Sequence, residues 1–316
     1  MSLTLSRSLP AHLSLAQEGN QYHQGIAAAL LTTFMWASWL ISVKLGTASS
    51  LTTFDLAIVR YGMPALVFSY FTFRARKQLK NTSWPLLVGI CLGAGLPFFF
   101  LGSLGMHYAP VTHAGVLLPG TFPFFVTGIA VLFYREALSK NRLIGLIAIA
   151  LGVAILLAQS FSSADENIWK GDLVFLLASF CWSVFCVCVR VSGLNSFVVA
   201  GLFGSVSSVM LLFLFLIGAV NSGIEFSLSN APLGFYAIQF IVQGILVGLI
   251  ASVSFSFAIA KIGAENTTMI GSLTPVVAIV LAFLVFAEMP TYLDFLAMAL
   301  VCFGVLRASN ASLLKK

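Results

Sequence analysis

Charged side chains are scarce in this sequence. Only 8% of its 316 residues are charged, 59% are hydrophobic, and the mean hydropathy is +1.03. A soluble domain typically has about 25% charged residues. Because so few charges cannot keep a chain of this size dissolved in water, a soluble globular protein is excluded. Lipid is expected to surround much of the chain.

Motifs of catalysis and nucleotide binding are also missing. The sequence contains no Walker sequence, no HExxH and no nucleophile elbow. An intramembrane enzyme would need histidines and carboxylates clustered at mid-membrane depth, and the sequence predicts no such cluster. We therefore expect no enzymatic activity, no catalytic residue, no metal and no cofactor.

The formal net charge of +6 does not indicate a nucleic-acid partner. The cations cluster between apolar runs instead of lining one face, and no nucleic-acid-binding motif accompanies them. The expected partners are the lipid bilayer and a small-molecule metabolite, with the protein acting as a monomer or a homodimer.

The cysteine content argues against disulfides. The sequence has five cysteines, an odd number, and all of them lie inside apolar runs. We interpret them as small apolar packing residues.

Apolar runs long enough to cross a bilayer occur ten times. A membrane helix needs about 20 mostly apolar residues. Candidate spans by this measure are 25–44, 55–73, 84–104, 112–134, 142–160, 171–190, 196–219, 234–258, 266–286 and 291–308. The segments that flank them, 1–24 and 309–316, are predicted to be a polar N-terminal tail and a basic C-terminal tail.

The distribution of cations predicts the orientation of these spans. With both termini in the cytoplasm, only Lys44 and Lys170 lie on the outer side, and Arg60 lies within a span. The other Lys and Arg residues then face the cytoplasm, as the positive-inside rule requires. We expect a multi-pass protein of the cell's inner (plasma) membrane with cytoplasmic N- and C-termini.

The sequence contains an internal repeat. The stretch FMWASWLISVK at 34–44 matches FCWSVFCVCVR at 180–190, and LLPGTFPFFVTGIAVLFYRE at 117–136 matches MIGSLTPVVAIVLAFLVFAE at 269–288. Each half, 25–160 and 171–308, contains five predicted spans. Because five is odd, the second half enters the membrane with the opposite polarity. The predicted fold is therefore an all-α membrane protein of ten helices in two inverted repeats, an architecture of many secondary transporters.

These residues resemble a known family. The sequence is similar to an EamA-type permease of the drug/metabolite transporter superfamily in one pattern. A span with a proline and a terminal glutamate is followed by a basic loop and by the glycine-bearing helix RLIGLIAIALGVAILLA. The second copy ends in Phe-Ala-Glu where that family more often has Leu-Gly-Glu. The resemblance implies a ten-helix inner-membrane transporter, and many such transporters export amino acids or other metabolites.

Several residues are candidates for the substrate path because they place polar or aromatic groups inside spans. They are Trp36, Arg60, His113, Trp182, Gln239 and Gln243. Arg60 could meet a substrate carboxylate or could reach outward toward Asp55. The two glutamines share a helix face, and either a polar path or hydrogen bonding between helices explains them.

The remaining candidates are positions that match between the repeats, or that open a span. Pro123 and Pro275 are expected to kink their helices. Glu136 and Glu288 lie at span ends, where a carboxylate stabilises the N-terminus of a neighbouring helix, so a structural role is favoured. His113 opens a span, where a histidine that meets water at the boundary is the simpler interpretation.

The function expected from these observations is secondary transport of a small polar or amphipathic metabolite, amino-acid-like and exported, by alternating access. No acidic residue is predicted at mid-membrane depth, which favours transport without obligatory proton exchange. A proton-coupled drug/metabolite antiporter is the alternative, and a passive channel or an intramembrane enzyme would be a function of a different class.

Overall fold

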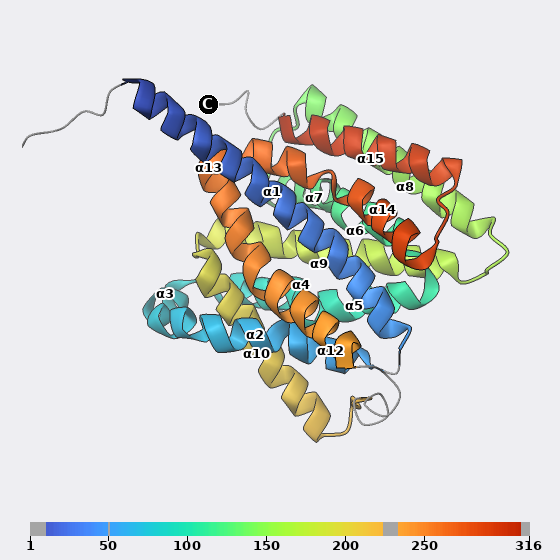
Figure 1. Cartoon of the computed structure of the whole chain (residues 1–316), viewed down its shortest axis with the longest axis horizontal. Coiled ribbons are helices and arrows are strands. Elements are labelled where there is room, and N and C mark those ends of the chain that lie inside the picture. The colour runs from blue at the N-terminus through green and yellow to red at the C-terminus, as the bar shows by residue number, and fades with distance from the viewer. Residues whose placement is uncertain (1–10, 50, 224–232, 311–316) are drawn as a thin grey trace, which may run out of the picture.

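The computed structural model describes residues 11–49, 51–223 and 233–310, and every regular element in these ranges is a helix (Figure 1). Residues 1–10 and 311–316 of the predicted tails (1–24 and 309–316) lie outside the described residues. The elements of the first half are α1 (Ala11–Thr47), α2 (Thr53–Arg74), α3 (Arg76–Asn81), α4 (Trp84–Ala94), α5 (Leu96–Tyr108), α6 (Val111–Gly120), α7 (Phe122–Tyr134) and α8 (Lys140–Phe161). Those of the second half are α9 (Ile168–Ser192), α10 (Ser196–Leu216), α12 (Leu233–Gln239), the π-helix η1 (Phe240–Ile250), α13 (Ala251–Gly271), α14 (Thr274–Phe286) and α15 (Tyr292–Asn310).

Nine stretches of helix within the described ranges are long and apolar enough to cross a membrane. The tenth predicted span corresponds to the 19-residue helix α15, which packs along α8 (Figure 1). This arrangement confirms the predicted all-α membrane fold. The first helix differs from the prediction, because α1 begins at Ala11 and residues 11–24 continue it as helix. That segment contains Ala, Leu, Gln and Glu, which favour helix, and no proline.

The third predicted span is broken in the middle. Helix α4 ends at Ala94, and α5 begins at Leu96 with a proline in its first turn. A proline has no N–H to donate to the carbonyl one turn earlier. The hydroxyl of Tyr61 on α2 supplies a donor here, lying 2.9 Å from the carbonyl oxygen of Ala94 and 2.7 Å from that of Gly95. The break is therefore stabilised inside the protein and can persist in lipid.

The fourth and ninth spans are broken at matching places. Helix α6 gives way to α7 at Thr121, and α13 gives way to α14 around Leu273, with Pro123 and Pro275 in the first turns of the second pieces. The hydroxyl of Thr121 donates to the carbonyl of Leu117 at 2.7 Å. The predicted kinks are thus full helix breaks, repeated in both halves.

The eighth span contains an irregularity that the sequence did not predict. Its middle, η1, is wound as a π-helix, which is rare and frequent at functional sites. The span ends at Gly263, where φ is 81° and the backbone leaves the helical region. A positive φ of this kind is easy for glycine because it has no Cβ.

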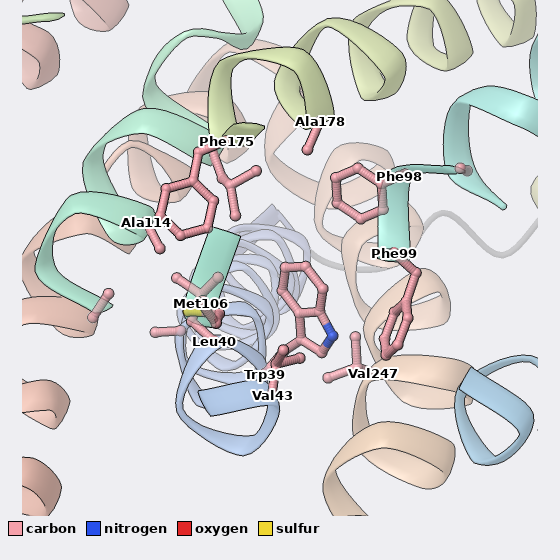
Figure 2. Packing of buried hydrophobic residues seen from close by; sticks show 14 of the residues in the cluster. Trp39, Leu40, Val43, Phe98, Phe99, Met106, Ala114, Phe175, Ala178 and Val247 are labelled. Atoms are coloured by element: carbon pink, nitrogen blue, oxygen red, sulfur yellow. The ribbon is translucent and has the colours of Figure 1, made fainter. Parts of the chain in front are cut away.

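Helices α8 and α15 pack closely because both carry glycine at the crossing. A Cβ placed on Gly145 would lie 2.5 Å from the carbonyl oxygen of Gly304, and a Cβ on Gly304 would lie 2.5 Å from that of Gly145. Close approach through small residues is a common way for helices to associate in membranes. The core between the helices is apolar and includes Trp39, Phe99 and Phe175 (Figure 2).

Candidate functional site

A cavity of about 670 Å³ lies between the two repeats. Trp36 and Trp182 line it in the middle of α1 and α9, and Arg142 and Arg190 line it at the ends of α8 and α9. The side chain of Arg190 is 49% exposed, so the cavity meets solvent there. We call this the open end of the protein, and the opposite end, where α6 and α15 begin, the closed end.

Aromatic rings form much of the cavity wall. Trp36 packs against Phe255 with ring centroids 5.2 Å apart, and Trp182 packs against Phe185 at 4.9 Å and Phe122 at 5.9 Å. The structure thus places both predicted tryptophans on the wall, one from each repeat. Their contact with a substrate stays a prediction.

The two paired prolines also line the cavity. Pro123 and Pro275 lie at the starts of α7 and α14, directly after the helix breaks. Their rings therefore form part of the cavity wall. The sequence predicted only that these prolines kink their helices.

Arg60 reaches the cavity from α2 and has no ion-pair partner among the described residues. The carboxylate of Asp55 accepts hydrogen bonds from the backbone of Thr52 at 2.8 Å and Gly223 at 2.8 Å, and from the hydroxyl of Ser222 at 2.6 Å. Asp55 therefore does not pair with Arg60. The Cζ of Arg60 lies 6.0 Å from the centroid of the Tyr61 ring.

The backbone at Arg60 is also unusual. Pro64 lies inside α2, so the Arg60 carbonyl has no N–H donor one turn later. Gly248 of η1 packs against it, since a Cβ on Gly248 would lie 3.4 Å from the Arg60 carbonyl oxygen. Helix α2 is therefore locally weakened at the residue that carries the cavity's deepest charge.

A smaller chamber of about 50 Å³ adjoins the cavity at Arg60. Trp36, Arg60 and Trp182 line both spaces, while Trp39 and Phe98 line only the smaller one. The indole Nε1 of Trp39 is buried and has no hydrogen-bond partner among the described residues. In Figure 2 this nitrogen lies on the side of the ring toward Phe99 and Val247.

Gln239 and Gln243 do not line the cavity. Both are buried and bond to Ser42 on α1: the Ser42 hydroxyl donates to Gln239 Oε1 at 2.7 Å, Gln239 Nε2 donates to the Ser42 carbonyl at 3.0 Å, and Gln243 Nε2 lies 3.2 Å from the hydroxyl oxygen. Of the two interpretations left open by the sequence, the structure supports hydrogen bonding between helices. These bonds join the first repeat to the second in the closed half of the protein.

His113 is not a boundary histidine that meets water. It is 3% exposed, with Nδ1 2.9 Å from Asp172 Oδ1 and Nε2 3.3 Å from Asp294 Oδ1. Ser160 donates to the other oxygen of Asp172 at 2.5 Å, and Gln159 Nε2 donates to Asp294 at 3.1 Å. This group, which we call the histidine cluster, lies at the closed end and away from the cavity. It joins α6 and α8 of the first repeat to α9 and α15 of the second.

The paired glutamates act at opposite ends. Glu288 accepts from the backbone N–H groups of Val111 at 3.4 Å and Thr112 at 3.3 Å, so it stabilises the start of α6 at the closed end. Glu136 pairs with Arg190 at 2.9 Å and lies 3.8 Å from Arg142 at the open end. The helix that Glu288 supports is α6 of the other repeat instead of the next helix along the chain.

Comparison with known proteins gives the family. The model of the EamA-like transporter family matches residues 23–158 and again residues 169–309. The chain belongs to the EamA-like transporter family. The double match agrees with the repeat in the sequence, and with the equivalent breaks in the fourth and ninth spans.

Two curated relatives of this EamA-like transporter come from Bacillus subtilis (strain 168). The uncharacterized transporter YyaM is 26% identical over 265 residues, covering 79% of this chain and 82% of the relative. The uncharacterized transporter YdfC is 27% identical over 291 residues, covering 87% and 89%. A solved crystal structure that is 20% identical has a TM-score of 0.59 and covers 92% of this chain and 99% of that one, which supports the fold.

Some cavity residues of this EamA-like transporter were not singled out from its sequence. Trp39 and Phe185 each lie three residues after a paired tryptophan, so they share its helix face, and the repeat carried that signal. Cys186 and Cys302 line the cavity, although the sequence indicated only packing roles for the cysteines. Arg142 had no such signal, because a cation at a span start satisfies the positive-inside rule without any further role.

Proposed function

We propose that this protein moves a small amphipathic metabolite of amino-acid size across the membrane by alternating access. The observation that supports the proposal is the cavity at mid-membrane depth, bounded by both repeats and open at one end. Its volume of about 670 Å³ lies within the range of about 300–1,000 Å³ usual for small-molecule sites. Its wall combines aromatic rings with one deep guanidinium, which suits a molecule with an apolar body and a polar group.

The proposed transport cycle follows from the inverted repeat. In the present structure the cavity is open toward Arg190, while the histidine cluster, the Glu288 contacts and the Ser42–glutamine bonds connect the repeats at the other end. Rocking of the repeats would break those contacts and bring the two halves together at the open end, so that the same site faces the opposite side.

We propose export as the direction, with the protein in the cell's inner membrane and both termini in the cytoplasm. The open end is then the cytoplasmic end, and a substrate enters the cavity from there. Cysteine labelling of intact cells tests the orientation. An impermeant reagent should label Lys170→Cys and spare Lys77→Cys; the reverse pattern would place the open end outside.

Transport is tested with purified protein in vesicles and a panel of metabolites. A carrier should give saturable uptake of an unchanged solute. Uptake that rises linearly to high concentration would indicate a channel, and chemical conversion of the solute would indicate an enzyme. Trp36→Ala and Trp182→Ala should each raise the half-saturating concentration by about tenfold or more, because aromatic contacts and buried area are lost. Trp84→Ala is the matched control, since Trp84 is 73% exposed on the surface.

Proton-coupled antiport is the second candidate, and the histidine cluster favours it. A histidine and two carboxylates are buried between helices that must separate when the closed end opens, so their surroundings change during the cycle. Histidine can exchange a proton near neutral pH. The test imposes a pH gradient at zero membrane potential with equal substrate on both sides. Uphill accumulation of the substrate that is lost in His113→Ala supports antiport. If the unmodified protein shows no uphill accumulation, the result supports transport without proton exchange.

A further inference from the structure

We propose that the small chamber at Arg60 binds a carboxylate, and that the substrate is a monoanion with a neutral, apolar body. This inference rests on the proposed transport function and specifies its substrate class. Arg60 is the counter-ion and the indole N–H of Trp39 is a second donor.

The first argument is the unpaired charge. A charged side chain inside a span costs about 2.5–3.5 kcal/mol even on lenient insertion scales, so it normally has a partner or reaches water. Arg60 lies well inside α2, lines both spaces and has no carboxylate partner among the described residues. Asp55, on the same helix, already accepts several hydrogen bonds. An anion that enters the chamber would provide the missing partner.

The second argument is the unpaired donor of Trp39, which lines the same small chamber as Arg60. Trp39 is 8% exposed and its Nε1 has no acceptor among the described residues, although a buried indole N–H usually finds one. The ring is held in place by stacking on Phe98 at 5.6 Å. A carboxylate has two oxygens, so it can accept from a guanidinium and an indole at the same time.

The third argument is size. The small chamber has a volume of about 50 Å³, which admits a group of a few atoms but no ring. An apolar body attached to the carboxylate must therefore stay in the larger space, among Trp36, Trp182, Phe185 and Phe255. The substrate is thus oriented with its anionic group toward the closed end.

The charges around the cavity decide between an anion and a zwitterion. The charged residues that line it, within the described ranges, are Arg60, Arg142 and Arg190, and no aspartate or glutamate joins them. The ammonium group of an amino acid would find no carboxylate there. A carboxylic acid whose remaining groups are neutral fits the lining better.

Binding by the purified full-length protein tests this inference with four probes that share a phenyl ring: phenylacetate, phenylacetamide, phenylalanine and 2-phenylethylamine. Titration calorimetry should give the tightest binding for phenylacetate, with the amide at least about tenfold weaker, since a hydrogen bond to a charged group is worth about 1.5–3 kcal/mol. Equal binding of the acid and the amide would overturn the inference.

Substitutions assign the preference to the chamber. Arg60→Gln should reduce the preference for the acid over the amide to within about twofold, and Arg60→Lys should keep part of it. Trp39→Phe keeps an aromatic ring, removes the N–H and should weaken phenylacetate binding by about tenfold. Arg74→Gln is the control on the same helix, because Arg74 lies at its end over Tyr70 and outside the cavity. If Arg60→Gln keeps the full preference for phenylacetate over phenylacetamide, Arg60 is not the counter-ion of the carboxylate.

Vesicle uptake separates this inference from the proposed function. If the neutral or cationic probes show saturable uptake without any preference for the acid, the proposed transport function is supported and the carboxylate site is overturned. Selective binding of phenylacetate without saturable uptake of any probe supports the site and contradicts transport of this class.

Discussion

The two ends of the molecule are built from equivalent helices of the two repeats, yet they are held in different ways. At the closed end, buried polar groups connect the repeats through His113, Asp172 and Asp294. At the open end, the described ion pair between the repeats joins Glu136 to Arg190, and both side chains are partly exposed. When Gly152 is matched with Gly304, Asp294 corresponds to Arg142, so equivalent positions carry opposite charges. Side chains at equivalent positions therefore hold the two ends differently.

The largest expected effect comes from breaking the histidine cluster. Asp172→Ala removes the carboxylate that contacts His113 Nδ1 and accepts from the Ser160 hydroxyl, and loss of one partner of a buried pair costs about 3–5 kcal/mol. Amide hydrogen exchange across residues 111–118 should become faster, because the closed end separates more often. Asp165→Ala is the control, since Asp165 is exposed and its carboxylate accepts from the backbone N–H of nearby Asn167. Unchanged exchange in Asp172→Ala would show that the cluster does not hold this end closed.

Removing the bonds around Ser42 should have a smaller effect of the same kind. Gln239→Ala removes the acceptor of the Ser42 hydroxyl and a donor to the Ser42 carbonyl, which costs about 1–3 kcal/mol for buried groups. Thermal stability in detergent should fall, while the half-saturating concentration for transport should stay within about twofold, because Gln239 does not line the cavity. A large loss of substrate affinity at unchanged stability would instead place Gln239 on the substrate path.

The open end should tolerate substitution better. Glu136→Gln removes an ion pair whose side chains are 37% and 49% exposed, and exposed pairs contribute only about 0–1 kcal/mol. The free energy of unfolding should therefore change by less than about 1 kcal/mol, as measured by denaturant titration in mixed micelles. A loss as large as that of Asp172→Ala would remove the distinction between the two ends.

The smallest effect concerns the backbone just before each paired glutamate. Arg135 has φ 52° and Ala287 has φ 53°, left-handed values that cost a residue with a Cβ about 1–2 kcal/mol. Arg135→Gly and Ala287→Gly should each stabilise the protein, by up to about 1 kcal/mol, and by similar amounts in thermal unfolding. If only one of the two variants were stabilised, the energetic cost of the left-handed conformation would differ between the repeats although the φ values agree.

Composition and periodicity were enough to predict the helical class, the spans and the repeat, because lipid imposes length and apolarity on every crossing segment. The paired Trp36 and Trp182 were found in the same way, through the repeat. The roles of Gln239 and His113 could not be predicted, since a polar residue in a span faces either a cavity or another helix. Which one it faces depends on how the helices are rotated against each other, and one sequence does not give that.

The missing helical hydrogen bond at Arg60 in α2 has a mechanical consequence. Pro64 deprives the Arg60 carbonyl of its helical bond, and Gly248 lets η1 approach this point, so α2 can flex here at less cost than elsewhere along its length. Flexing shifts the guanidinium along the membrane normal. An anion that neutralises this guanidinium would change the balance between the bent and straighter forms of α2. Substrate charge and the shape of one helix would then be linked through a single residue, so that an empty and a loaded cavity need not prefer the same conformation.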